Sequence, residues 1–175
     1  MNKAIFLDKD GTLVDNSQYP EIIPTDTLLE HDILEGLLYL QQRNFKLIIV
    51  SNQSFITKGR LTEQQVHEIF KSVIMQLKKK GIDITAYYFC PHRSEDHCPC
   101  HKPATALVQK AAQAYHLDLP SCYFVGDMEE DILTGKNAGM KTVLVRTGKG
   151  GSYSLSNGIP DYTIPNLNHI REVLQ

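Results

Sequence analysis

The 175-residue sequence has no long apolar run, no excess of basic residues and no internal repeat. No stretch approaches the roughly 20 apolar residues that a membrane helix needs. It has 18 Lys and Arg residues against 20 Asp and Glu residues, a net charge of -2, so a large basic surface for nucleic acid is not expected. Asp8 interrupts the first apolar run, which argues against a signal peptide. We therefore expect a cytoplasmic protein with neither nucleic-acid nor membrane partners.

Residues 1–175 are expected to form one globular domain. Hydrophobic residues make up 42% of the sequence and charged residues 22%, and no linker or low-complexity segment is found. Nearly continuous apolar runs predict strands buried on both faces, at 4–8, 46–52, 86–90, 122–127 and 141–146. Helical patterns occur at 32–43, 62–81, 104–116 and 129–138, followed by a weak strand at 162–164 and a short helix. This alternation predicts an α/β fold with a three-layer, doubly wound, Rossmann-like parallel sheet.

Polar side chains stand where three of these predicted strands end. Asp8 and Asp10 follow the first strand, Ser51 and Asn52 close the second, and Asp127 closes the fourth. In a parallel sheet, binding groups collect at the carboxyl ends of the strands, around the switch point of the strand order. We therefore expect these side chains to converge in space.

Two carboxylates one residue apart need a compensating charge. A divalent cation supplies it, and oxygen ligands suit Mg²⁺, which commonly also binds a substrate phosphate. Asp127 is the natural further ligand, and Asp131, one helical turn on, is a candidate for an outer position. Lys102 would supply positive charge and Ser51 a hydroxyl donor, so the set could handle a phosphoryl group. Taken singly, each motif has a structural alternative, since Asp and Gly favour turns and an acidic helix start favours the helix dipole.

Three of the four cysteines crowd into residues 90–100, beside histidines. The pattern C-x-H-x5-C-x-C offers three thiolates and one imidazole, which fill a tetrahedral zinc shell without an open position. The predicted ligands are Cys90, His92, Cys98 and Cys100, with His97 and His101 as alternative histidines. A structural zinc ion would fix the loop that leads into Lys102; the alternative is a set of reduced cysteines in an ordinary loop. Cys122 is expected to be a small buried apolar residue.

Four stretches of the chain resemble the ordered motifs of the haloacid dehalogenase (HAD) superfamily of phosphatases. They are FLDKDGT (6–12), IVSNQ (49–53), Lys102 before Pro103, and VGDMEED (125–131). The resemblance spans residues 4–131, most of the chain. It implies the HAD fold and magnesium-dependent hydrolysis of phosphomonoesters, and the motif spacing leaves little room for a separate cap domain.

The same resemblance implies a role for each residue. Asp8 would attack phosphorus and form an aspartyl-phosphate, while Asp10 would protonate the leaving oxygen and then deprotonate the attacking water. Mg²⁺ would be held by the carboxylates of Asp8 and Asp127 and by the backbone carbonyl of Asp10. Ser51 and Lys102 would bind the phosphoryl oxygens.

The zinc loop narrows the resemblance to a subgroup that contains D-glycero-D-manno-heptose 1,7-bisphosphate 7-phosphatases and histidinol-phosphate phosphatases. Residues 51–63 are similar to the heptose enzymes of carbohydrate metabolism, whereas the short zinc loop is closer in length to the histidinol-phosphate branch. Phe55 stands where the heptose enzymes usually carry glycine, and His101 replaces a common arginine. The resemblance implies a small phosphorylated substrate, with a sugar bisphosphate as first choice and histidinol phosphate as second.

An open site would be roofed by loops at 15–27 and 53–60 and by the zinc loop. The expected substrate contacts are Ser51, Asn52, Lys58, Arg60, His101 and Lys102. Three further alternatives are a polynucleotide 3′-phosphatase, disfavoured by the negative net charge, a signalling receiver domain, and a non-catalytic interaction module stapled by zinc. The protein is expected to be a monomer or a weak homo-oligomer.

Overall fold

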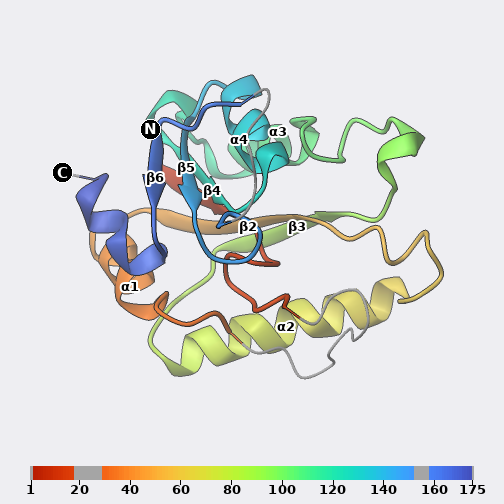
Figure 1. The fold of residues 1–175 in the computed structure, drawn as a ribbon, viewed down its shortest axis with the longest axis horizontal. Helices are drawn as coiled ribbons and strands as arrows, with labels where there is room; N and C mark the ends of the chain where they lie inside the picture. Colours follow the sequence, from red (N-terminus) through yellow and green to blue (C-terminus); the bar gives the residue numbers. More distant parts are fainter. Residues whose placement is uncertain (1, 18–28, 152–157, 175) are drawn as a thin grey trace.

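A parallel sheet of six strands forms the middle layer of the computed structural model, which describes residues 2–17, 29–151 and 158–174 (Figure 1). The strands are β1 (Ala4–Leu7), β2 (Lys46–Asn52), β3 (Ala86–Cys90), β4 (Tyr123–Gly126), β5 (Lys141–Val145) and β6 (Tyr162–Ile164). The helices are α1 (Leu34–Gln42), α2 (Glu63–Lys79), α3 (Ala106–Tyr115) and α4 (Glu129–Asn137), with 3-10 segments η1 (Ser94–Asp96), η2 (Leu119–Ser121) and η3 (Leu167–Glu172). The predicted alternation is confirmed, and the expected closing helix is of the 3-10 type.

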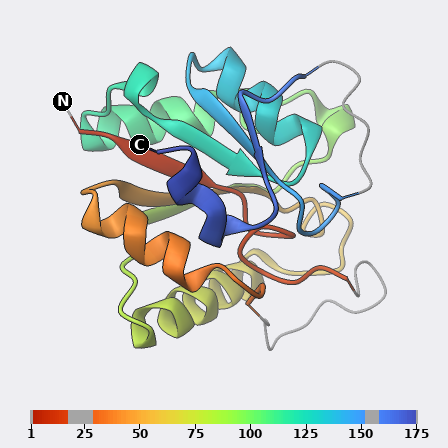
Figure 2. The ribbon, with the colours of Figure 1, turned by 60° about the vertical axis from the view of Figure 1, so that its left-hand side comes forward.

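Helices cover both faces of the sheet, which confirms the predicted three layers (Figures 1 and 2). On one face, α1, α2 and η3 pack over a core that includes Ile5 and Phe70. On the other face, which α3 and α4 cover, Phe6 stacks on Phe124 with ring centroids 6.2 Å apart. Successive residues of a strand point to opposite faces, so the continuous apolar run of β1 supplies both cores at once.

The strand order β3-β2-β1-β4-β5-β6 reverses direction between β1 and β4. β1 pairs in parallel with β2 on one side and with β4 on the other. Leu7 is the partner of Val125, and the Asp8 backbone N–H donates to the Val125 carbonyl at 3.0 Å. The residues that follow β1 and β4 therefore emerge side by side, at the switch point where open α/β sheets bind ligands.

The described connections between strands and helices contain turns and short 3-10 segments but no inserted folded module, as expected for a fold without a cap domain. The chain between β2 and α2, for example, is a run of turns at 54–59. The predicted roof loop 15–27 lies largely outside the described residues. None of the described helices has both the length and the apolar character needed to cross a membrane.

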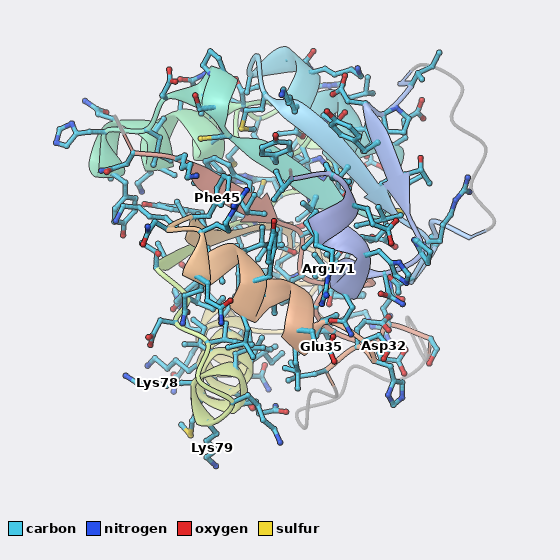
Figure 3. All side chains as sticks on the ribbon, turned by 90° about the vertical axis from the view of Figure 1, so that its left-hand side faces the viewer. Asp32, Glu35, Phe45, Lys78, Lys79 and Arg171 are labelled. Atoms are coloured by element: carbon cyan, nitrogen blue, oxygen red, sulfur yellow. The ribbon has the colours of Figure 1, made fainter. Side chains whose placement is uncertain are left out.

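Helix α1 and segment η3 lie against each other (Figures 2 and 3). The Gly36 N–H donates to Asn168 Oδ1 at 3.0 Å, and Glu35 pairs with Arg171 at 3.3 Å across this seam. The approach is closest at Gly36, where an added Cβ would come within 1.9 Å of the Leu167 carbonyl oxygen. Glycine at this position lets the two segments touch.

Gly36→Ala should destabilise the fold, because the added methyl group meets backbone rather than a movable side chain. We expect the free energy of unfolding, measured in urea, to fall by about 1–3 kcal/mol, the usual cost of overpacking. The control, Gln42→Ala, changes an exposed residue of the same helix and should stay within about 0.5 kcal/mol of the unmodified chain. Equal stability of the two variants would contradict the tight seam.

Candidate active site

A cavity of about 270 Å³ opens at the carboxyl ends of the central strands. It is lined by Asp8, Asp10, Asn16, Ser51, Asn52, Phe55, Lys58, Met128, Glu130 and Lys149. The structure thus brings together five residues proposed from the sequence for catalysis or substrate binding: Asp8, Asp10, Ser51, Asn52 and Lys58.

Three buried aspartates meet where β1 and β4 end. Asp8, Asp127 and Asp131 each place a carboxylate oxygen within 4.8 Å of the others. Lys102, which is 1% exposed, donates from Nζ to Asp8 Oδ1 at 2.6 Å and to Asp131 Oδ1 at 2.5 Å. One ammonium and three ionised carboxylates leave two negative charges in a site shielded from water. A divalent cation would balance them.

Burial makes ionisation of these carboxylates costly. It raises the pKa of Asp8 to about 7, although the Lys102 ammonium acts in the opposite direction. It raises the pKa of Asp127 to about 8, and the charge of Asp8 adds to the effect. Burial alone would lower the pKa of Lys102, but the Asp131 and Asp8 carboxylates outweigh it and raise that pKa above its ordinary value. Near neutral pH the cluster must therefore hold a proton or bind a cation.

Asp127 has the open carboxylate oxygen that a metal ion needs. Its Oδ1 is buried without a hydrogen-bond partner, whereas its Oδ2 accepts from the Lys149 backbone N–H at 2.7 Å. Gly11 and Gly148 enclose this carboxylate so closely that a Cβ added to either would lie 2.4 or 2.3 Å from Oδ2. A fixed carboxylate with one unpaired oxygen, close to Asp8, fits Mg²⁺, which prefers oxygen ligands.

Lys102 is held through both its side chain and its backbone. Asp131 accepts from the ammonium with Oδ1 and from the Met128 N–H with Oδ2 at 3.0 Å, so both of its oxygens are occupied. This arrangement is compatible with the outer position expected for Asp131. Asn52 Oδ1 accepts from the Lys102 N–H at 2.9 Å, and Asn52 Nδ2 donates to the Lys102 carbonyl at 3.3 Å. Asn52, expected to contact substrate, thus also holds the chain that carries Lys102.

The carboxylate of Asp10 is not part of the three-aspartate cluster. Its Oδ1 pairs with the Lys9 ammonium, and its Oδ2 accepts from Gln53 Nε2 at 2.8 Å. The same Gln53 nitrogen donates to Ser51 Oγ at 3.0 Å. Lys9 is 1% exposed, and its Nζ lies 5.7 Å from the centre of the Phe70 ring. The cation that pairs with Asp10 is therefore buried. The Asp10 carboxylate therefore has its own set of partners, separate from the acidic cluster.

The remaining expected substrate contacts differ in position. Lys58 lines the same cavity as Asp8, whereas Arg60 is exposed two residues further along the chain. Lys58 Nζ and the Arg60 guanidinium lie 5.8 and 5.3 Å from the centre of the Phe55 ring. His101 lines a neighbouring cavity of about 390 Å³ instead, and its Nδ1 is 2.8 Å from the Lys102 carbonyl oxygen. Of residues 58–60, which we call the basic loop, Lys58 thus faces the candidate site, whereas His101 and Lys102 line the neighbouring cavity.

Several groups of the site were not predicted from the sequence. They are the side chains of Lys9 and Gln53, the backbone N–H of Lys149, and the cavity-lining residues Asn16, Met128 and Glu130. Gln53 directly follows Ser51 and Asn52, so its place at the strand end could have suggested it. The backbone N–H of Lys149 offered no such indication, because the direction of this main-chain group is set by the turn at 148–151.

A second cluster joins the end of β3 to the chain that precedes Lys102. Its members are Cys90, His92, Cys98 and Cys100. Neighbouring donor atoms lie 3.0–3.5 Å apart, too far for disulfides, whose sulfurs are about 2.05 Å apart. Three sulfurs and one imidazole nitrogen gathered in this way are the donor set of tetrahedral metal sites. The alternative histidines, His97 and His101, do not belong to the cluster.

The fold and these two clusters define a class of protein. Aspartates follow β1, a serine is the last residue but one of β2, a lysine precedes α3 and further aspartates follow β4, all at one edge of a doubly wound sheet. This order of groups, with a site suited to a divalent cation, is that of the HAD-like phosphatases.

Comparison with known sequences agrees with this class. The family model described as HAD-hydrolase-like matches residues 99–170. The chain is 33% identical to D-glycero-beta-D-manno-heptose-1,7-bisphosphate 7-phosphatase from Haemophilus influenzae over 183 residues, covering 100% of this chain and 98% of that protein. It is 36% identical to the protein of the same name from Pasteurella multocida over 156 residues, covering 85% of this chain and 84% of that protein.

A solved structure matches over the same extent. The crystal structure of D,D-heptose 1,7-bisphosphate phosphatase from B. bronchiseptica, complexed with magnesium and phosphate, aligns with a TM-score of 0.88 and 26% identity, covering 99% of this chain and 98% of that chain. The chain therefore belongs to the HAD-like hydrolases, in the family of the D-glycero-D-manno-heptose 1,7-bisphosphate 7-phosphatases. This result confirms the family indicated by the four motifs.

Proposed function

We propose that this protein is a cytoplasmic, magnesium-dependent phosphatase that removes the 7-phosphate of D-glycero-D-manno-heptose 1,7-bisphosphate. The observation that carries the proposal is the position of the Asp8 carboxylate, which lines the cavity, accepts from Lys102 and shares the acidic cluster with Asp127. A nucleophile, a cation and a metal-binding carboxylate in one site are what phosphoryl transfer requires. The names of the relatives support the choice of substrate.

The reaction would proceed in two steps. A carboxylate oxygen of Asp8 bonds to phosphorus while the bond from phosphorus to the sugar oxygen breaks, and Asp10 gives its proton to that oxygen. Asp10 then takes a proton from a water molecule that attacks phosphorus, which releases phosphate and restores Asp8. Asp10 is suited to both steps because it lines the cavity together with Asp8.

The surrounding groups would stabilise the charge of the transition state. Ser51 lines the cavity and can donate its hydroxyl proton to a phosphoryl oxygen, and the Lys102 ammonium lies next to the attacking carboxylate. A bound Mg²⁺, held by the carboxylates of Asp8 and Asp127 and the backbone carbonyl of Asp10, would neutralise charge on the phosphoryl group.

The Cys/His cluster would hold a structural Zn²⁺ ion. Thiolates are the form that binds metal. Burial raises the pKa of the Cys90 and Cys100 thiols, whereas burial of Cys98 is outweighed by hydrogen bonds from Cys100 and Cys90, which lower its pKa to about 7. A bound cation would stabilise all three thiolates. The zinc loop also contacts the run of turns at 54–59, where the Arg93 guanidinium donates to the Thr57 carbonyl at 3.0 Å. A zinc ion would therefore restrict the movement of both Lys102 and the basic loop.

The cavity lining favours a bisphosphate and gives one reason to keep histidinol phosphate as the second candidate. Lys58 and Lys149 both line the cavity and suit a second phosphate group. Glu130 also lines it, and its carboxylate could pair with the amine of histidinol phosphate. The two substrates therefore differ in whether the distal group meets lysine or glutamate.

Asp8→Asn should abolish turnover and leave the fold intact, because an amide is not a nucleophile. With Mg²⁺ and p-nitrophenyl phosphate, we expect kcat to fall at least about 10³-fold, or about 4 kcal/mol in activation free energy. The thermal midpoint should not fall, since one of three crowded buried negative charges is removed. Asp83→Asn, at an exposed position, serves as the control and should keep full activity. Substantial residual turnover in Asp8→Asn would show that the nucleophile is misassigned.

We expect steady-state kinetics to give a higher kcat/KM for the heptose bisphosphate than for sugar monophosphates or histidinol phosphate. Lys58→Ala should lower that kcat/KM by about tenfold, equivalent to about 1.4 kcal/mol, because the distal phosphate loses a cation. Its turnover of p-nitrophenyl phosphate, which has no distal phosphate, should stay within about twofold. Lys71→Ala, exposed on α2, is the matched control. Equal or better use of histidinol phosphate would end the sugar assignment.

Cys98→Ser should release zinc and lower the melting temperature more than it alters kcat at saturating Mg²⁺, because a hydroxyl replaces a thiolate ligand. We expect elemental analysis to find one zinc ion per unmodified chain. Cys122→Ser changes a cysteine outside the cluster and should retain its zinc. Full zinc content and unchanged melting in Cys98→Ser would rule out a structural metal at this loop.

A further inference from the structure

Gln53 is a buried side chain that joins two functional groups of the site. It follows β2 directly, is 3% exposed, and has its backbone N–H fixed on the Cys90 carbonyl at 2.7 Å. Its side-chain nitrogen donates to Asp10 Oδ2 at 2.8 Å and to Ser51 Oγ at 3.0 Å. Both protons of the amide group are therefore used on residues of the site.

The hydrogen bond from Gln53 to Ser51 leaves the serine hydroxyl free to act as a donor. A hydroxyl has one proton to donate and two lone pairs to accept. Because Gln53 occupies a lone pair of Ser51 Oγ, the serine proton is left for another acceptor. Ser51 lines the cavity, where a phosphoryl oxygen is the acceptor that the proposed reaction would bring.

The bond to Asp10 fixes the second oxygen of that carboxylate. Asp10 Oδ1 pairs with the buried Lys9 ammonium, which also lies beside the Phe70 ring of α2. Gln53 holds the other oxygen at the cavity, next to Ser51. Without an N–H donor at position 53, Lys9 would remain as the partner of Asp10 among the hydrogen bonds described.

We propose that Gln53 is a positioning residue that keeps the Asp10 carboxylate in place for proton transfer to the leaving oxygen and from the attacking water, and keeps Ser51 as a donor. This inference rests on the proposed function. The effect of Gln53 on the rate of phosphoryl transfer should then depend on the leaving group of the substrate. An alkoxide needs a proton as it leaves, whereas nitrophenolate is stable without one.

The test is Gln53→Met, which keeps the length of the side chain and removes both donors. On a sugar phosphate, kcat should fall about 10²-fold while KM stays within about twofold. With p-nitrophenyl phosphate, the first nitrophenolate should be released at a rate within about threefold of the unmodified chain. Later turnovers should be slow, because hydrolysis of the aspartyl-phosphate still needs Asp10 as a base. A burst of one nitrophenolate per chain is therefore expected.

A merely structural role would predict a different result. It would slow the first turnover of both substrates to the same extent, without a burst, and that outcome would overturn the inference. If the methionine variant fails to fold, Gln53→Glu serves in its place, because a carboxylate also lacks the N–H donors. It should show the same loss of kcat on the sugar phosphate and the same burst with p-nitrophenyl phosphate. Gln64→Met, at an exposed position of α2, should behave like the unmodified chain. The Asp8→Asn assay tests the aspartyl route separately, so normal turnover of both substrates by an active Gln53→Met chain would overturn the positioning role alone.

Discussion

The ion cluster around Lys102 is the constraint on which the rest of this structure depends. A buried ammonium or carboxylate is costly alone, yet here the Lys102 ammonium contacts Asp8 and Asp131 while one oxygen of Asp127 has no partner. The cluster can form because β1 and β4 are neighbours in the sheet although they are far apart in the sequence. Its remaining negative charge is what makes the site suited to a divalent cation and an anionic substrate together.

Much of the surrounding structure serves to hold Lys102 in that cluster. Asn52 pairs with its backbone from the end of β2, and the cysteine–histidine loop leads into it from the end of β3. The same loop contacts the turn before α2 through Arg93 and Thr57. The described residues, which include no inserted cap, therefore shape the cavity with loops that contact one another. A metal ion in the Cys/His cluster would replace the core that such loops lack.

In the proposed reaction, chemistry and specificity would be separated within the cavity. Asp8, Asp10 and Ser51 lie at or just after the ends of buried strands, whereas Phe55, Lys58 and Glu130 line the cavity from a loop and from the start of α4. Rigid strand ends suit groups that need exact placement, and loops suit contacts that vary between related enzymes. Phe55 lines the cavity and lies beside both Lys58 and Arg60, so in the proposed reaction it would stand where the distal part of the substrate binds.

The sequence alone determined the strands, the order of the acidic groups and the C-x-H-x5-C-x-C pattern, because these depend on local apolar runs and on spacing. It could not show that His92 rather than His97 or His101 joins the cysteines, that Lys9 is buried behind Asp10, or that one glutamine amide would link two strand ends. Those contacts were decided by the strand order and the turns, since each joins side chains whose directions are set only when distant segments pack. Local patterns predict which groups reach an edge of the sheet, and packing decides which of them touch.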